Sequence, residues 1–210
     1  MIKKANFLIG EPGAGKSFFC KLAKKDFDIE WISMSKLLLN DYSSTKKELV
    51  NDETVIHILS NYIRSTAVNE IMNIDGYPRT EVQAKAILKW NQSKLIEPKV
   101  LVLTYESLDP NIIWEYLKRR KTCNSCGFTV IQCDGFLLKQ SCPNCSHGKL
   151  TSRFMDKSEY LYRVQDYRYY IKKILLTFEE ENIPTKTLHV NPCNPNVIQY
   201  LIKEKENEFF

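Results

Sequence analysis

The segment GEPGAGKS, residues 10–17, has the spacing G-x-x-x-x-G-K-[ST], which is typical of a loop that binds the phosphates of a nucleotide. Its glycines allow tight turns, so that successive backbone N–H groups can point at phosphate oxygens. Lys16 is placed to reach the β- and γ-phosphates, and the Ser17 hydroxyl is placed to ligate Mg²⁺. The predicted ATP contacts here are Gly10, Pro12, Gly13, Ala14, Gly15, Lys16, Ser17 and Phe18. A structural glycine turn is the alternative interpretation.

The segment IDGYPRT, residues 74–80, places an acid, a glycine, a proline and an arginine directly after a predicted strand. Asp75 is expected to hold Mg²⁺ through water, as an acid on a second strand does in proteins with such loops. Arg79 is expected to bind a phosphate, because its planar guanidinium matches two phosphate oxygens. The alternative interpretation is a Gly-Pro turn followed by a solvated arginine.

Two C-x-x-C pairs, separated by fifteen residues, have the spacing of a tetrahedral four-thiolate zinc site. Four thiolates complete the tetrahedron, so the pattern favours a structural Zn²⁺ over a catalytic one, although the spacing alone leaves iron open. The predicted ligands are Cys123, Cys126, Cys142 and Cys145. The other three of the seven cysteines are scattered, and we interpret them as small buried hydrophobic residues.

Strand and helix patterns alternate along the chain, which predicts an α/β fold with a parallel sheet. The apolar runs that predict strands lie at 5–9, at 29–33, before Asp75, at 99–107 and at 186–191. Helical spacing follows Lys16 and recurs at 34–39, 48–65, 81–92, 109–121, 157–182 and 194–210. Within 48–65, the apolar side chains expected on the core face are Val55, Ile58, Leu59 and Ile63.

Composition favours one domain with insertions, since 43% of the 210 residues are hydrophobic and no low-complexity run occurs. The formal net charge of +5 can arise from residues that bind phosphates, so it does not by itself indicate a nucleic-acid surface. The N-terminal segment lacks a signal-peptide pattern, and no stretch approaches the roughly 20 apolar residues of a membrane span. We therefore expect a soluble, cytoplasmic monomer that does not bind membranes.

In their order and spacing, these motifs resemble the adenylate kinase family, in its long form with a zinc-bearing lid, over nearly the whole chain. The resemblance rests on GEPGAGKS, ELVNDETVIHIL, DGYPRTEVQAKAI, RRKTCNSCG and CPNC, with an arginine and an acid after the lid. It implies a P-loop NTPase-type parallel sheet flanked by helices, with the core at 1–32, 63–120 and 155–210. It also implies a helical monophosphate-binding insertion at 33–62 and a small zinc-ribbon lid at 121–154.

The resemblance implies Mg²⁺-dependent transfer of the ATP γ-phosphoryl group to AMP, giving two ADP. Gly76, Arg79 and Gln83 would hold the monophosphate nucleotide, with Arg79 on its phosphate and Gln83 facing its base. Asp156 would pair with an arginine in the closed state. The implied catalytic residues are Lys16, Arg79, Arg120, Arg153 and Arg163, and Arg120 would also contact ATP. The implied AMP contacts are Met34, Lys36, Gly76, Arg79, Gln83, Arg153 and Arg163, with Arg168 as the alternative to Arg163.

The segment SMSKLLLN departs from the family pattern. Met34, Ser35 and Leu39 stand where the family carries threonine, glycine and arginine, and Lys36 offers only a nearby point charge. This departure leaves open an acceptor other than AMP, or weak activity.

A different class is a P-loop ATPase or switch protein whose zinc ribbon binds nucleic acid or protein. Between Cys123 and Leu150 the ribbon has only Lys139 and Lys149 as basic residues, so nucleic acid is not the expected partner. A segment of this size also has too little core to fold alone, which favours a lid stapled by metal.

Overall fold

Strands and helices alternate along the chain in the computed structural model, which describes residues 2–41, 50–67, 71–105, 109–131, 141–143, 145–152 and 156–190. The strands are β1 (Lys3–Gly10), β2 (Ile32–Ser33), β3 (Met72–Asp75), β4 (Ile96–Tyr105), β5 (Arg120–Cys123), β6 (Thr129–Ile131), β7 (Leu150–Ser152) and β8 (Thr185–Val190). The helices are α1 (Lys16–Phe27), α2 (Met34–Asp41), α3 (Asp52–Ser65), α4 (Glu81–Gln92), α5 (Pro110–Leu117) and α6 (Lys157–Glu180). The helix predicted at 194–210 lies outside the described residues.

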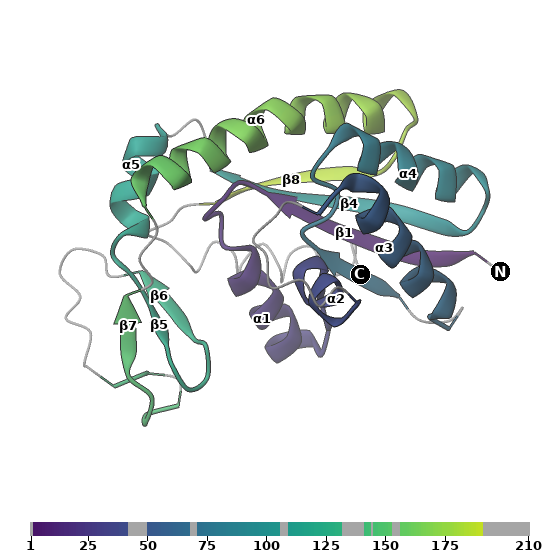
Figure 1. Ribbon diagram of the computed structural model, residues 1–210. Helices are drawn as coiled ribbons and strands as arrows, with labels where there is room; N and C mark the ends of the chain where they lie inside the picture. The colour runs from purple at the N-terminus through teal and green to yellow at the C-terminus, as the bar shows by residue number, and fades with distance from the viewer. Residues whose placement is uncertain are drawn as a thin grey trace.

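The central sheet has five parallel strands in the order β2-β3-β1-β4-β8. Helices α4 and α6 lie along one face and α1 lies on the other, so the sheet is covered on both sides (Figure 1). This arrangement confirms the predicted α/β fold of the P-loop NTPase type. Because β1 and β3 are adjacent and parallel, Gly10 and Asp75 end their strands at the same edge of the sheet.

Helix α3 follows a polar N-cap residue, and its apolar residues recur at helical spacing. The Asn51 side chain accepts a hydrogen bond from the Thr54 N–H at 2.8 Å, which satisfies one N–H of the first turn. The four predicted core residues are all buried, each stabilising the fold by about 1.5–3 kcal/mol. The helix continues to Ser65, past the expected end of the insertion at 62.

A buried lysine ties the start of β1 to the end of α3. Lys3 is only 6% exposed, and its ammonium donates to the carbonyls of Ile63, Arg64 and Thr66 at 2.5, 3.1 and 2.5 Å. A cation at a helix C-terminus satisfies carbonyls that lack helical partners and interacts favourably with the helix dipole. The central strand therefore holds the phosphate-binding loop at one end and α3 at the other.

A second, smaller sheet lies between α5 and α6 in the chain. It is antiparallel, with the order β6-β5-β7, and it carries the first cysteine pair at the end of β5 (Figure 1). The Lys21 ammonium, on α1, donates to the carbonyl of Gly127, so this sheet contacts the helix that follows the phosphate-binding loop. No helix in the described part of the chain is long and apolar enough to cross a membrane.

Candidate active site

The loop at residues 10–17 joins β1 to the N-terminus of α1 in the conformation that its glycines permit. Gly13 and Gly15 have φ angles of 89° and 82°, a region that side-chain-bearing residues rarely adopt. A Cβ atom on Gly10 would lie 2.4 Å from the Leu103 carbonyl oxygen, so only glycine fits there. The Glu11 N–H donates to that same carbonyl at 3.0 Å. The loop thus directs the N-terminus of α1, with its positive dipole end, toward the edge of the sheet.

Lys16 folds back across this loop. Its ammonium donates to the carbonyls of Gly10 at 2.6 Å and Glu11 at 3.3 Å. Removal from water lowers the pKa of Lys16 to about 8; the charge of Asp75 opposes the shift, while Arg79 and Arg163 add to it. An ammonium held by carbonyls and crowded by other cations gains a strong partner when a phosphate arrives.

Two cations, Lys16 and Arg79, lie near the acid at the end of β3, and a third, Arg163, lies near both of them. Burial raises the pKa of Asp75, whereas Lys16 and Arg79 act against that rise. Arg163 lies close enough to lower the pKa of both Lys16 and Arg79, after the larger effect of their own removal from water. Asp75 Oδ1 is buried and has no hydrogen-bond partner among the described residues. An orphaned carboxylate oxygen beside this excess of positive charge fits a hydrated cation bound together with a polyanion.

The turn after β3 holds Arg79 at this place. Gly76 has a φ angle of 88°, and its N–H donates to the Leu8 carbonyl at 2.9 Å. Arg79 Nε donates to the Gly76 carbonyl at 3.0 Å, and the Arg79 backbone N–H donates to Gln83 Oε1 at 2.8 Å. The guanidinium is therefore anchored through Nε at the turn that follows β3.

Gln83 is buried, and its side-chain amide links the Arg79 turn to α3. Besides accepting from Arg79, it donates through Nε2 to Asp52 Oδ1 at 2.7 Å. The other oxygen of Asp52 accepts from Thr80 Oγ1 at 2.9 Å. The resemblance implied that Gln83 faces the nucleotide base, but in this conformation its amide binds protein groups. Asp52, which the sequence alone did not single out, completes the network.

Replacing Asp52 with alanine is expected to lower the free energy of unfolding by about 1–3 kcal/mol, because it leaves the buried Gln83 amide without its acceptor. Urea denaturation followed by circular dichroism measures the change. Glu53→Ala is the matched control, since Glu53 is exposed and lies in the same first turn of α3. Equal losses for the two variants would show that the network contributes nothing beyond the interaction of an acid with the helix dipole.

The segment SMSKLLLN, which departs from the family pattern, has residues in different environments at the start of α2. The Met34 side chain is 2% exposed and belongs to the hydrophobic core, so it offers a nucleotide no polar atom. Lys36 is exposed, and Leu39 is 72% exposed. A leucine this open to water at the position of the family arginine leaves that phosphate contact unfilled on α2.

Of the three arginines expected to act with the lid, the two that the structure describes lie on different elements. Arg120 begins β5, and its charge opposes the rise that burial causes in the pKa of Tyr105, whose hydroxyl donates to the Gly13 carbonyl. Arg163, on α6, lies near Lys16 and Arg79. Arg153 lies outside the described residues. Asp156 caps α6 by accepting from the Ser158 N–H at 2.8 Å, and its pairing with an arginine stays a prediction.

Arg168, the alternative to Arg163, pairs with an acid inside the phosphate-binding loop. Its Nη2 and Nε atoms lie 2.9 and 3.1 Å from Glu11 Oε1. Glu11 is 2% exposed, so a buried carboxylate sits directly behind the loop. Arg163 therefore lies near Lys16 and Arg79, whereas Arg168 pairs with Glu11. The sequence shows Glu11 between Gly10 and Pro12, but it does not indicate that Arg168 pairs with this acid.

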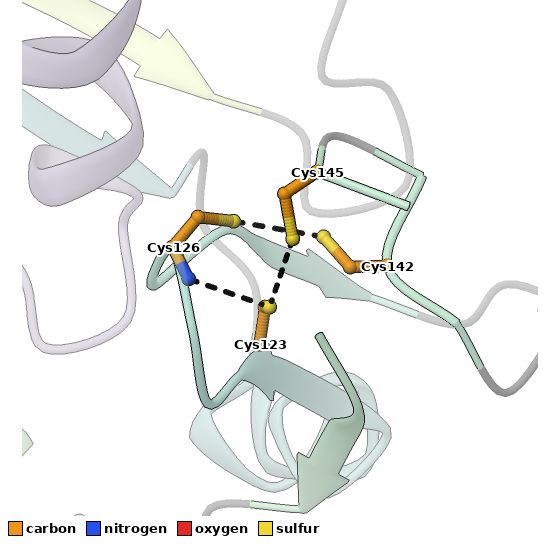
Figure 2. Close-up of side chains that lie close together, drawn as sticks. All are labelled: Cys123, Cys126, Cys142 and Cys145. Atoms are coloured by element: carbon orange, nitrogen blue, oxygen red, sulfur yellow. Dashed lines mark hydrogen bonds between the residues drawn. The ribbon is translucent and has the colours of Figure 1, made fainter. Parts of the chain in front are cut away.

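The four predicted metal ligands come together at the tip of the smaller sheet, with their sulfur atoms pointing toward one another (Figure 2). All four sulfurs lie within 4.8 Å of one another. Cys123 Sγ is 3.7 Å from Cys145 Sγ, and Cys126 Sγ is 3.6 Å from Cys142 Sγ. A zinc tetrahedron with Zn–S bonds of about 2.3 Å has edges of about 3.8 Å, which these separations match.

The backbone around this cluster favours thiolates. The Cys126 N–H donates to Cys123 Sγ and lowers the pKa of that thiol, and the Ser125 N–H acts in the same direction. A Cβ atom on Gly148 would lie 2.2 Å from Cys123 Sγ, so the chain passes too close to the sulfurs for a side chain. Donors to sulfur and close backbone approach are typical of a metal knuckle.

Wild-type protein is expected to contain about one metal ion per chain. Replacing Cys142, which is 1% exposed, with serine is expected to remove most of that metal, because a tetrahedral thiolate site loses a ligand. Elemental analysis of protein purified without added metal measures the content and distinguishes zinc from iron. Hydrogen exchange is expected to accelerate in β5 and β7 and to stay unchanged in β1. Cys20→Ser, outside the cluster, is the control. A wild-type protein without metal would contradict the site.

Comparison with known protein families matches residues 9–125 to a family model described as "AAA domain". The match covers more than half of the 210 residues and includes the phosphate-binding loop, the Asp75 turn and β4. The chain belongs to this family. Within the AAA domain match lie Lys16, Asp75 and Arg79, whereas Arg163 and the second cysteine pair follow it.

Curated relatives of this AAA domain chain carry the description "Adenylate kinase". The protein of Clostridium tetani is 26% identical over 195 residues, covering 84% of this chain and 87% of the relative. That of Borreliella burgdorferi is 28% identical over 214 residues, covering 93% and 97%. That of Rickettsia bellii is 27% identical over 213 residues, covering 95% and 91%. The predicted resemblance to the adenylate kinase family is thus confirmed over most of the chain, as is the expectation of a phosphotransferase enzyme.

Proposed function

We propose that the protein is an adenylate kinase that transfers the γ-phosphoryl group of Mg²⁺-ATP reversibly to AMP, giving two ADP. The observation that carries this proposal is the convergence of Lys16, Arg79 and Arg163 beside the phosphate-binding loop. A single phosphate-binding loop needs one such cation. Additional arginines from the β3 turn and from α6 suit a second phosphate placed in line with the first.

In this mechanism, an oxygen of the acceptor phosphate forms a bond to the γ-phosphorus while the bond to the β–γ bridging oxygen breaks. Arg79 orients the acceptor phosphate, because its anchored guanidinium presents donors on one side. Lys16 and Arg163 stabilise the negative charge on the equatorial oxygens of the transferring group, with Arg120 and Arg153 contributing from the lid side. No general base is required, since the acceptor oxygen is already ionised.

Two bound metals complete the proposal. Ser17 and, through water, Asp75 would hold Mg²⁺, which neutralises charge on the β- and γ-phosphate oxygens when ATP is bound. The orphaned Asp75 Oδ1 supports this assignment. The four cysteines would hold Zn²⁺ as a structural ion, as their spacing supports. With Zn²⁺ bound, residues 121–154 would form the lid, residues 33–62 the acceptor-binding insertion and the remaining residues the core. The protein would be a cytoplasmic monomer.

An assay with a panel of acceptors tests the function. Purified protein is incubated with Mg²⁺-ATP and separately with AMP, CMP, UMP, GMP or no acceptor, and the nucleotides are resolved by chromatography. The proposal expects ADP to accumulate in the AMP reaction alone and a bisubstrate inhibitor, two adenosines joined by five phosphates, to block it. ATP that binds without transfer to any acceptor would contradict it and favour a P-loop ATPase or switch protein.

A different acceptor is the second candidate, and exposed Leu39 favours it. AMP would meet no arginine on α2, and the Gln83 amide that would face its base is bound to Arg79 and Asp52. Turnover with CMP, UMP or GMP in the same panel would keep the mechanism and change the specificity. Inhibition of each reaction by the other acceptor would then show which of the two nucleotides the enzyme prefers.

A further inference from the structure

Glu11 places a buried negative charge directly behind the backbone of the phosphate-binding loop. It lies inside the phosphate-binding loop, with its backbone held by the Leu103 carbonyl and by the Ala14 N–H, so it moves with the loop. Its carboxylate is 2% exposed and therefore poorly screened by water. ATP brings several negative charges to the same loop, and an uncompensated buried carboxylate there would repel them.

Arg168 is positioned to cancel this charge. It reaches Glu11 Oε1 with both Nε and Nη2, from α6 at the far end of the chain. Three tyrosines also face Glu11, since burial raises the pKa of Tyr105, Tyr160 and Tyr167 and Glu11 adds to each rise. Arg120 acts on Tyr105 in the opposite direction. Lys16 contacts the Glu11 carbonyl rather than its carboxylate. The guanidinium of Arg168 therefore binds the Glu11 carboxylate directly and offsets its charge.

We infer that Arg168 is a positioning residue for ATP, which it serves by pairing with Glu11 and so keeping the phosphate-binding loop electrostatically suited to a triphosphate. It acts through Glu11 and contacts neither substrate. This inference rests on the proposed ATP chemistry. It assigns a role to the arginine that the geometry separates from the transferring phosphoryl group, and it explains how the loop tolerates an acid between Gly10 and Pro12.

The test combines a single and a double substitution. Arg168→Gln is expected to raise the Kd for ATP, and its KM, by about tenfold or more, since a buried charge loses its partner, while the KM for the acceptor changes by less than about twofold. Adding Glu11→Gln is expected to return ATP affinity to within about threefold of wild type, because the uncompensated charge is then gone. Lys172→Gln, an exposed cation on the same helix, is the control.

The readout that a structural role would not move is the split between the KM for ATP and the KM for the acceptor. ATP binding is measured by titration calorimetry on each variant, with thermal unfolding recorded in parallel.

The outcomes separate the inference from the function. ATP affinity unchanged in Arg168→Gln, or not recovered by Glu11→Gln, overturns the inference even if wild type is an active kinase. If wild type transfers no phosphoryl group but these ATP affinities follow the expected pattern, the inference holds and the proposed function fails. If Arg168→Gln does not fold, the double variant still decides: folded and binding ATP supports the inference, and loss of either overturns it.

Discussion

Replacing Lys16 with methionine is expected to lower kcat for phosphoryl transfer by about 10³-fold, because a preorganised donor to the transferring oxygens is removed. Methionine keeps the length and apolar stem of lysine, so the loop and α1 should fold as before. The expected result is a protein with unchanged circular dichroism, weaker ATP binding and almost no ADP formation. Lys25→Met, an exposed change on the same helix, is the control and should retain wild-type turnover.

The pKa of Lys16 adds a test by pH. Burial lowers this pKa from its usual value to about 8 in the nucleotide-free protein, so Lys16 loses its charge as the pH rises through that value. Because kcat/KM reports ionisation of the free enzyme, kcat/KM for ATP is expected to fall above about pH 8. Bound phosphate favours the protonated form, so kcat should stay flat there. Lys16→Arg, which keeps its charge, should lose the alkaline fall; a fall of equal size in that variant would contradict the assignment.

Replacing Arg163 with alanine is expected to lower kcat by about 10³–10⁵-fold, the range found for arginines that stabilise a transferring phosphoryl group. The reason is its place near Lys16 and Arg79, where its charge lowers the pKa of both. Arg163→Lys should recover only part of the loss, since an ammonium lacks the planar fork. Single-turnover kinetics with saturating ATP and acceptor separate this effect on chemistry from effects on binding.

The kinetics of the Arg163 and Arg168 variants distinguish the roles of these two arginines. If Arg163 acts on the transferring group and Arg168 on ATP through Glu11, Arg163→Ala lowers kcat and Arg168→Gln mainly raises the KM for ATP. The opposite pattern would exchange their roles. Arg64→Ala, which removes an exposed guanidinium from α3, controls for general loss of positive charge and should leave both parameters unchanged.

The parts of the fold that depend on local rules were predictable from the sequence. Glycine spacing indicated the loop at residues 10–17, and helical spacing indicated which face of α3 is buried, because both patterns depend on residues a few positions apart. The cysteine cluster was equally predictable, since metal coordination fixes its spacing. The catalytic and binding roles assigned to individual residues stay predictions.

Contacts between distant segments were not predictable. Nothing near Glu11 in the sequence indicates that Arg168 will pair with it, and nothing near Gln83 indicates that Asp52 will bind its amide. The resemblance supplied a role for Gln83 from other proteins, but the side chain that faces it here depends on how α3 packs against α4. The burial of Met34 likewise follows from the packing of α2 on the sheet. Such pairings arise from tertiary structure, which a single sequence does not encode in its local spacing.

The order of strands in the sheet also affects when the protein can fold during its synthesis. β1 is made first, yet it is central: Ala5 aligns with Met72 on one side and with Pro98 on the other. The loop that follows depends on the Leu103 carbonyl, which Glu11 contacts. At ribosomal rates of about 5–20 residues per second, that carbonyl is synthesised about 5–20 s after the loop. Such long-range pairing makes for slow folding, and an emerging chain contains the nucleotide motif well before it contains the partners that shape it.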